Sequence, residues 1–99
     1  MDERTKVIFR MWRGEVIALF PEIPSDSDMW FNCLSYAHMG QHSAASPRII
    51  IYNSRPATPE EYADLKTELE SYPYEYDLVV CQRLTHTMTL NREKTWRRG

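Results

Sequence analysis

Apolar residues near the start of the chain predict a β-hairpin. Residues 6–12 are rich in β-forming side chains that alternate in part between apolar and polar. Residues 15–20 are apolar on both faces, which is typical of a strand near the middle of a sheet. The dipeptide at 13–14 fits a two-residue turn, because its glycine accepts a positive φ. Pro21 and Pro24 are expected to end the hairpin, because proline lacks the amide proton of a strand ladder.

The middle of the chain predicts two further strands joined by a loop. Residues 29–38 fit a strand with mixed faces, although Asp28 also fits the cap of a short helix. Residues 40–47 are small and polar, so we expect a loop or a single helical turn there. Residues 48–52 are largely β-branched and are predicted as a strand buried on both faces.

A capping box gives the clearest local signal in the chain. The Thr58 side chain can accept a hydrogen bond from the Glu61 amide, and the Glu61 carboxylate can accept one from the Thr58 amide. Pro59 suits the first helical position, where its missing proton costs nothing. Pro73 ends the predicted helix at about residues 71–72. One side of this helix is apolar and comprises Tyr62, Leu65, Leu69 and Tyr72.

These elements predict an α+β fold in the order β-β-β-β-α-β, with residues 78–81 as the last strand. We expect a four- to five-stranded, largely antiparallel sheet with one amphipathic helix packed on one face. That helix is expected to close the only hydrophobic interior. The chain is predicted to be a single domain, residues 1–99, with an ordered core at about 6–84 and a basic C-terminal tail at about 85–99.

Composition limits the class of protein and its compartment. With 42% hydrophobic and 26% charged residues, the chain has the balance of an ordinary globular domain. No stretch reaches the roughly 18–20 continuous apolar residues of a membrane span, and the charged start of the chain is unlike a secretory signal. Cys33 and Cys81 form no CxxC motif. We therefore predict reduced cysteines and a cytoplasmic protein without membrane contact.

The net charge of −2 hides a segregation along the chain. Residues 1–13 and 91–99 each hold four basic side chains and are net positive, whereas residues 14–90 hold four basic against eleven acidic ones. A nucleic-acid-binding domain usually presents a basic face, so the acidic body argues against that class. Contact with nucleic acid through the basic termini stays open as a weaker alternative.

The stretch between Cys33 and His42 carries most of the candidate chemistry. Two histidines four residues apart would share one face of a helix, as in metalloproteases, but Gly40 weakens a helix there. No glutamate follows His38 to act as a base. A metal site or thiol enzyme centred on Cys33, His38 and His42 is the alternative, although we predict no metal and no cofactor. The candidate binding residues are Tyr36, His38, Gly40, Gln41 and His42.

Acidic residues on the predicted helix admit two interpretations. Runs of like charge usually solvate an exposed helix face. Alternatively, Glu61, Asp64 and Glu68 form an acidic docking face for a basic partner.

Three segments together resemble a family of small uncharacterised bacterial proteins. They are Glu15-Val16-Ile17-Ala18-Leu19-Phe20-Pro21-Glu22, Tyr36-Ala37-His38-Met39-Gly40-Gln41-His42, and Glu60-Glu61-Tyr62 with Leu65 and Glu68-Leu69. The resemblance spans about residues 6–83. It implies a bacterial, cytoplasmic protein and brings no activity or catalytic residue.

The sequence therefore predicts a non-enzymatic binding or protein-interaction domain. Its site is expected in a loop at residues 36–47, because loops on a rigid sheet often carry function. The partner is an unidentified protein or small ligand. A homodimer is also expected, because Trp12, Trp30 and Tyr74 exceed the aromatic surface that one helix covers.

Overall fold

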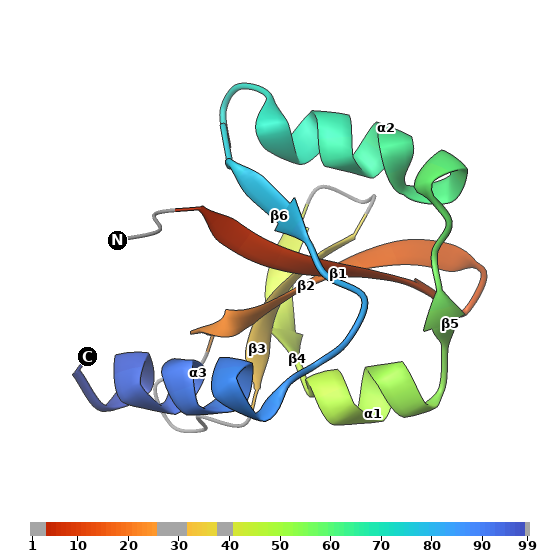
Figure 1. Cartoon of the computed structure of the whole chain (residues 1–99). Coiled ribbons are helices and arrows are strands. Elements are labelled where there is room, and N and C mark those ends of the chain that lie inside the picture. Colours follow the sequence, from red (N-terminus) through yellow and green to blue (C-terminus); the bar gives the residue numbers. More distant parts are fainter. Residues whose placement is uncertain (1–3, 26–31, 38–40, 99) are drawn as a thin grey trace.

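The computed structural model describes residues 4–25, 32–37 and 41–98, and for Gln41 and His42 it describes the backbone only. Helices cover both faces of one sheet (Figure 1). The strands are β1 (Thr5–Trp12), β2 (Glu15–Pro24), β3 (Cys33–Ala37), β4 (Gln41–Ala45), β5 (Arg55–Pro56) and β6 (Leu78–Val80). The helices are α1 (Pro47–Tyr52), α2 (Pro59–Glu70) and α3 (His86–Arg98).

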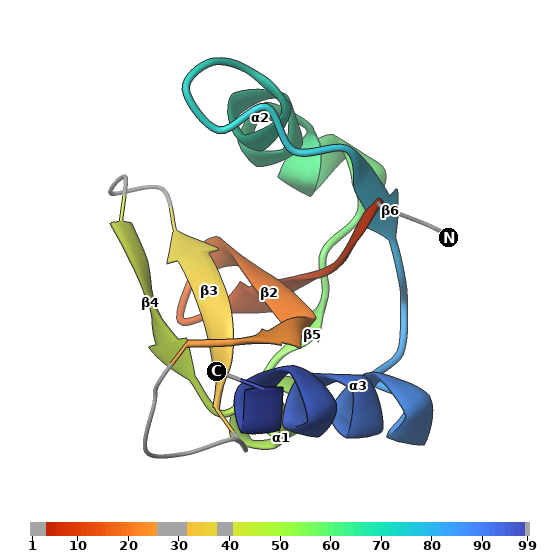
Figure 2. The same cartoon turned by 90° about the vertical axis from the view of Figure 1, so that its left-hand side faces the viewer.

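The strand order confirms the α+β class and the largely antiparallel sheet. The order is β4-β3-β2-β1-β5, and each pair of neighbours in it is antiparallel. β6 runs parallel to β1 and pairs with its first residues, Thr5 to Val7. β5 pairs with Arg10 and Met11 on the same side of β1. β4 consequently lies at the opposite edge of the sheet, as Figure 2 shows.

The predicted hairpin is confirmed, with one correction at its end. Arg13 and Gly14 have φ of 54° and 80°, the two positive values that a hairpin turn matching the strand twist requires. β2 nevertheless continues past Pro21 to Pro24. Its pairing with β3 is irregular between Phe20 and Pro24. Proline is tolerated at such irregularities because no ladder donor is needed there.

The capped helix packs on the sheet as predicted, except that Tyr72 lies beyond the end of the helix and is 86% exposed. Thr58 Oγ1 accepts from the Glu61 amide at 3.3 Å, and Glu61 Oε1 accepts from the Thr58 amide at 2.9 Å. Leu65 and Leu69 are buried, and the Tyr62 ring stacks on Phe9 with centroids 4.4 Å apart. The cluster under α2 comprises Val7, Phe9, Ala18, Phe20, Tyr36, Ala57, Leu65, Leu69 and Leu78.

A second hydrophobic cluster covers the other face, so the expectation of one helix and one interior is wrong. Figures 1 and 2 show α2 on one side of the sheet and α1 and α3 on the other. The second cluster comprises Ile8, Ile17, Leu19, Cys33, Ile50 and Met88.

Among the described residues no helix is both long and apolar enough to cross a membrane.

Residues 48–52, predicted as a strand, belong to helix α1. Pro47 stands at the first helical position, where its fixed φ favours a helix. The other end is held by Arg10, whose Nη2 donates to the carbonyls of Ile51 at 3.0 Å and Ser54 at 2.7 Å. A cation at a helix C-terminus satisfies the last carbonyls and complements the helix dipole. These contacts outweigh the β propensity of the isoleucines.

Residues 85–99, predicted as a basic tail, largely form helix α3. Met88 and Arg92 are buried against the sheet. The Arg92 Nη1 donates to the Pro21 carbonyl at 2.7 Å, and the Asn91 side-chain Nδ2 donates to Glu22 Oε2 at 2.6 Å. Met88 and Arg92 are the only buried side chains of the helix, so its sequence pattern of apolar and polar residues resembles that of a polar tail.

Candidate functional site

Within the predicted 36–47 segment, strand β4 lies at the edge of the sheet, and one of its two sides is not paired with any described strand. Residues 41–45 form a strand, so the prediction of a loop there is wrong. β4 pairs with β3, with Leu34 opposite Ala44, Ser35 opposite Ser43 and Tyr36 opposite His42. No other described strand pairs with it. We call the side of β4 away from β3 the β4 edge.

Ladder parity identifies which backbone groups point out of the β4 edge. Antiparallel neighbours alternate between pairs that exchange two hydrogen bonds and pairs that exchange none. The two-residue turn makes Trp12 and Glu15 a hydrogen-bonded pair. When this alternation is followed from β1 through β2 and β3, Ser43 belongs to a pair that exchanges two hydrogen bonds with β3. The N–H and C=O groups of His42 and Ala44 therefore point outward.

Hydrogen bonds on the far side of β1 agree with this alternation. The same parity turns the carbonyls of Val7 and Phe9 away from β2. The Cys81 amide donates to the Val7 carbonyl at 2.8 Å, and the Ala57 amide donates to the Phe9 carbonyl at 3.1 Å. The register is thus consistent from one edge of the sheet to the other.

The two edges of the sheet differ in how they are protected. Natural edge strands resist pairing with other chains by being very short or by carrying charge or proline. β5 has only two residues, an arginine and a proline, and so has all three features. β4 has five residues and contains no proline and no Lys, Arg, Asp or Glu. The β4 edge therefore remains a template for an added strand.

A cleft of about 310 Å³ adjoins the β4 edge on the α1 face of the sheet. Its polar groups include Ser35 and Ser43, which hydrogen-bond each other across the ladder. Ile49 on α1 is 62% exposed beside it, although isoleucine is usually buried. We call this the β4 cleft; its lining is Trp12, Ile17, Ser35, Ser43, Ala44, Ala45, Ser46, Ile49 and Ile50.

Tyr36, a candidate binding residue, is instead part of the interior under α2. It is 2% exposed, and its hydroxyl donates to the Glu68 carboxylate. Its ring meets Tyr74 edge-on at 5.2 Å. The hydrogen bond to Glu68 is the main cause that raises the pKa of Tyr36 above its usual value. The arrangement points to a structural role that ties β3 to α2.

The other candidates of this segment are only partly described. His38 and Gly40 lie outside the described residues. Gln41 and His42 lie in β4, and their side chains lie outside the description. The structure therefore places the backbone of the segment from residue 41 onward, and the side chains of the histidine pair lie outside the described part of the chain.

Cys33, the thiol of the alternative enzyme hypothesis, lies in the interior on the α1 and α3 face. It packs with Leu19 and Met88, and burial raises its pKa to about 11 despite the nearby Arg92. A protonated, buried thiol is a poor nucleophile. Cys33 pairs with Ala45, three positions along β4 from His42. Within the described residues no three His, Cys, Asp or Glu side chains are grouped as metal ligands.

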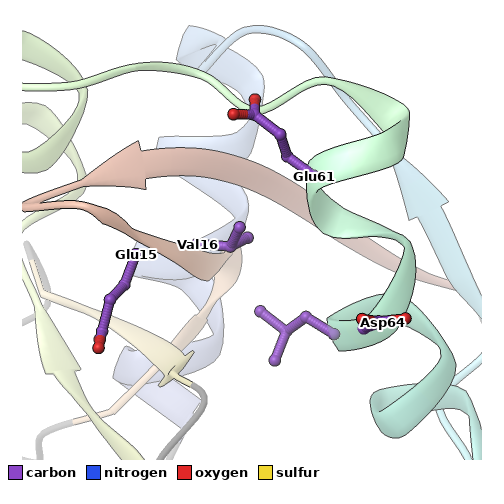
Figure 3. A pocket seen from close by; sticks show the side chains of 5 residues that line it. Glu15, Val16, Glu61 and Asp64 are labelled. Carbon is purple, nitrogen blue, oxygen red and sulfur yellow. The ribbon is translucent and has the colours of Figure 1, made fainter.

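The acidic docking residues do not act as one surface. Glu61 and Asp64 line a cleft of about 240 Å³ with Glu15, Val16 and Leu65. Figure 3 shows Glu61 and Asp64 projecting from α2, and Glu15 and Val16 projecting from the start of β2. Glu68 is engaged by Tyr36 instead. The Glu61 carboxylate accepts from Arg55 Nη1 at 2.8 Å and Nη2 at 2.6 Å.

Glu61→Gln is expected to flatten the acid limb of the stability profile. The hydrogen bonds from Arg55, and next the Thr58 amide, lower the pKa of Glu61 from 4.5 to about 2. Because the pKa is depressed in the folded state, this stabilisation is present above the unfolded value and is lost as the pH falls towards 2. Urea midpoints from pH 7 to pH 2 measure it, with exposed Glu60→Gln as control. A gap between Glu61→Gln and wild type that does not shrink with acid would contradict this assignment.

The basic termini are largely occupied within the fold. Arg4 pairs with Asp77, Lys6 with Glu22 and Arg97 with Glu93. Arg10 and Arg92 are buried. The positive charge that motivated the nucleic-acid alternative is therefore partly neutralised by neighbouring carboxylates.

Comparison with known proteins does not assign the chain to a family. No family model, no curated protein and no solved structure matches it. The resemblance to small uncharacterised bacterial proteins therefore stays a prediction. The β4 edge and β4 cleft were missed at the sequence level, although the absence of charge and proline from residues 41–45 was a usable signal.

Proposed function

We propose that this protein is a non-enzymatic interaction domain that binds an extended segment of a partner polypeptide along the β4 edge. The observation that carries the proposal is the outward N–H and C=O groups of His42 and Ala44 on an unprotected strand. An extended peptide pairs with such groups through main-chain hydrogen bonds. Binding of this kind uses the predicted segment, but as a strand and not as a loop.

The β4 cleft supplies side-chain selectivity for the bound strand. In strand addition, pockets beside the edge accept alternate side chains of the peptide. The cleft is bordered by Trp12 and the exposed Ile49, so it favours an apolar side chain. The partner segment is therefore expected to be rich in β-forming residues, with an apolar residue on the α1 face.

We also propose that the protein works in a bacterial cytoplasm. Cys33 and Cys81 are both unpaired thiols, which fits a reducing compartment. The homodimer predicted from the sequence would compete for the same edge, with two β4 strands paired across a two-fold axis, and is the alternative to a partner polypeptide. Of the aromatic residues behind that prediction, Trp12 and Tyr74 are half-buried and Trp30 lies outside the described residues.

Ala44→Pro is expected to abolish peptide binding without unfolding the protein. The substitution removes an outward donor, and proline is tolerated on the solvent side of an edge strand. Ala44→Val is the matched control, because it keeps the amide and is a good strand former. A displayed library of random heptapeptides is selected on the wild-type protein, and the enriched peptides are titrated into both variants by calorimetry.

Three outcomes of this experiment would count against the proposal. The first is that the library yields no binding peptide. The second is that the enriched peptides bind Ala44→Pro as tightly as wild type. The third is a dimer, detected by light scattering, that Ala44→Pro dissociates. The β4 edge would then bind a second copy of the chain and not a different protein.

A further inference from the structure

Three arginines line a separate pocket of about 600 Å³ between β1, α1, β5 and the segment that joins β6 to α3. Arg10 comes from β1, Arg48 from α1 and Arg83 from the segment between β6 and α3. Tyr52 and Gln82 also line the pocket. None of the described residues that line it is acidic. It shares no lining residue with the β4 cleft. Its volume lies in the usual range of small-ligand pockets, about 300–1,000 Å³.

The charge of this pocket is unusual for its surroundings. Residues 14–90 are acidic overall and contain only four basic side chains: Arg48, Arg55, Lys66 and Arg83. Arg55 and Lys66 are each paired with a glutamate. Arg48 and Arg83 form no ion pair or hydrogen bond with any described residue. Both of the unpaired cations of the acidic body thus line one pocket.

Arg10 is the third arginine that lines the pocket, and its side chain is held in place by hydrogen bonds. It is 7% exposed, and its Nε donates to Ser54 Oγ at 2.9 Å. Its Nη2 donates to the carbonyls of Ile51 in α1 and of Ser54 just after the helix. Its Nη1 has no hydrogen-bond partner among the described residues. Neutral acceptors therefore orient this side chain and leave its charge uncompensated by a carboxylate.

We propose that this pocket binds a small organic phosphate. Planar guanidinium groups match phosphate oxygens in paired hydrogen bonds, and three of them suit a dianion better than a carboxylate. Tyr52, which is 88% exposed, offers an aromatic surface for a flat, apolar portion of the same ligand. The ligand class is a phosphate monoester carried on an aromatic or heterocyclic group.

Calorimetric titration of the full chain with adenosine 5′-monophosphate, inorganic phosphate and adenosine tests the proposal. We expect the monophosphate to bind, inorganic phosphate to bind at least about tenfold more weakly, and adenosine not to bind measurably. Arg48→Gln and Arg83→Gln should each weaken monophosphate binding by at least about tenfold, the scale of a lost charge-assisted hydrogen bond. Both arginines are exposed, so urea unfolding midpoints should not change.

Arg98→Gln is the matched control, because it removes the same charge from an exposed position of α3 outside the pocket. The control is expected to retain wild-type affinity. Equal weakening by Arg98→Gln, binding of adenosine as tight as that of the monophosphate, or no binding of either phosphate would overturn the proposal. Equal affinities for inorganic phosphate and the monophosphate would overturn its aromatic part.

Discussion

A chain that ends at Thr85 is expected to lose cooperative folding. Helix α3 supplies Met88 to the second hydrophobic cluster and covers Leu19 and Cys33. Each fully buried Leu, Ile or Met side chain contributes about 1.5–3 kcal/mol. Exposing several of them removes an amount comparable to the whole stability of a domain this size, about 5–15 kcal/mol.

Circular dichroism and urea unfolding of residues 1–85 measure this effect against the full chain. We expect a non-cooperative urea transition and loss of the near-ultraviolet signal. The full-length double variant Lys94→Ala, Thr95→Ala is the control, because both residues lie on the exposed side of α3. A truncated chain with the same urea midpoint as the full chain would restore the interpretation of these residues as a tail.

Leu69→Ala is expected to cost about 3–4 kcal/mol, the second-largest effect on stability. Leu69 belongs to α2 and is fully buried in the cluster that contains Phe20 and Tyr36. Truncation to alanine removes its burial and leaves a cavity that the packed strands β1 to β3 cannot close. Denaturant unfolding of both proteins gives the free energy of unfolding.

Thr67→Ala is the matched control for this substitution. Thr67 lies exposed on the same helix, two residues away, and its change should alter stability by less than about 0.5 kcal/mol. A Leu69→Ala protein as stable as this control would contradict the packing of α2 on the sheet.

The elements predicted correctly are those whose signals are local. The turn at Arg13 and Gly14 joins strands that are adjacent in sequence, and the capping box is contained in residues 58–61. The formation of helix α1 involves a contact between residues distant in sequence. The arginine that donates to the carbonyl of Ile51 comes from β1, 41 residues away. Helix α3 likewise depends on a bond between Arg92 and the carbonyl of Pro21. Pattern reasoning within a short window does not detect such contacts.

The segment predicted to carry the site has a different structure from the one expected, because residues 41–45 form a strand and not a loop. Small side chains at residues 41–45 suit a loop, yet they also suit an edge strand that packs against little. Tyr36, predicted as a binding residue, instead pairs its hydroxyl with Glu68 in the interior. The arginine pocket is invisible in sequence, because Arg48 and Arg83 meet only when α1 and the β6–α3 connection are placed together.

Amide hydrogen exchange along β4, followed by NMR in the free protein, tests the central claim most directly. The ladder predicts slow exchange at Ser43 and Ala45, whose amides face β3, and fast exchange at His42 and Ala44, whose amides face solvent. Addition of a selected peptide should then slow Ala44. Uniformly fast exchange from 41 to 45 would show that no strand is present, and protection of Ala44 without peptide would show that the edge is already covered.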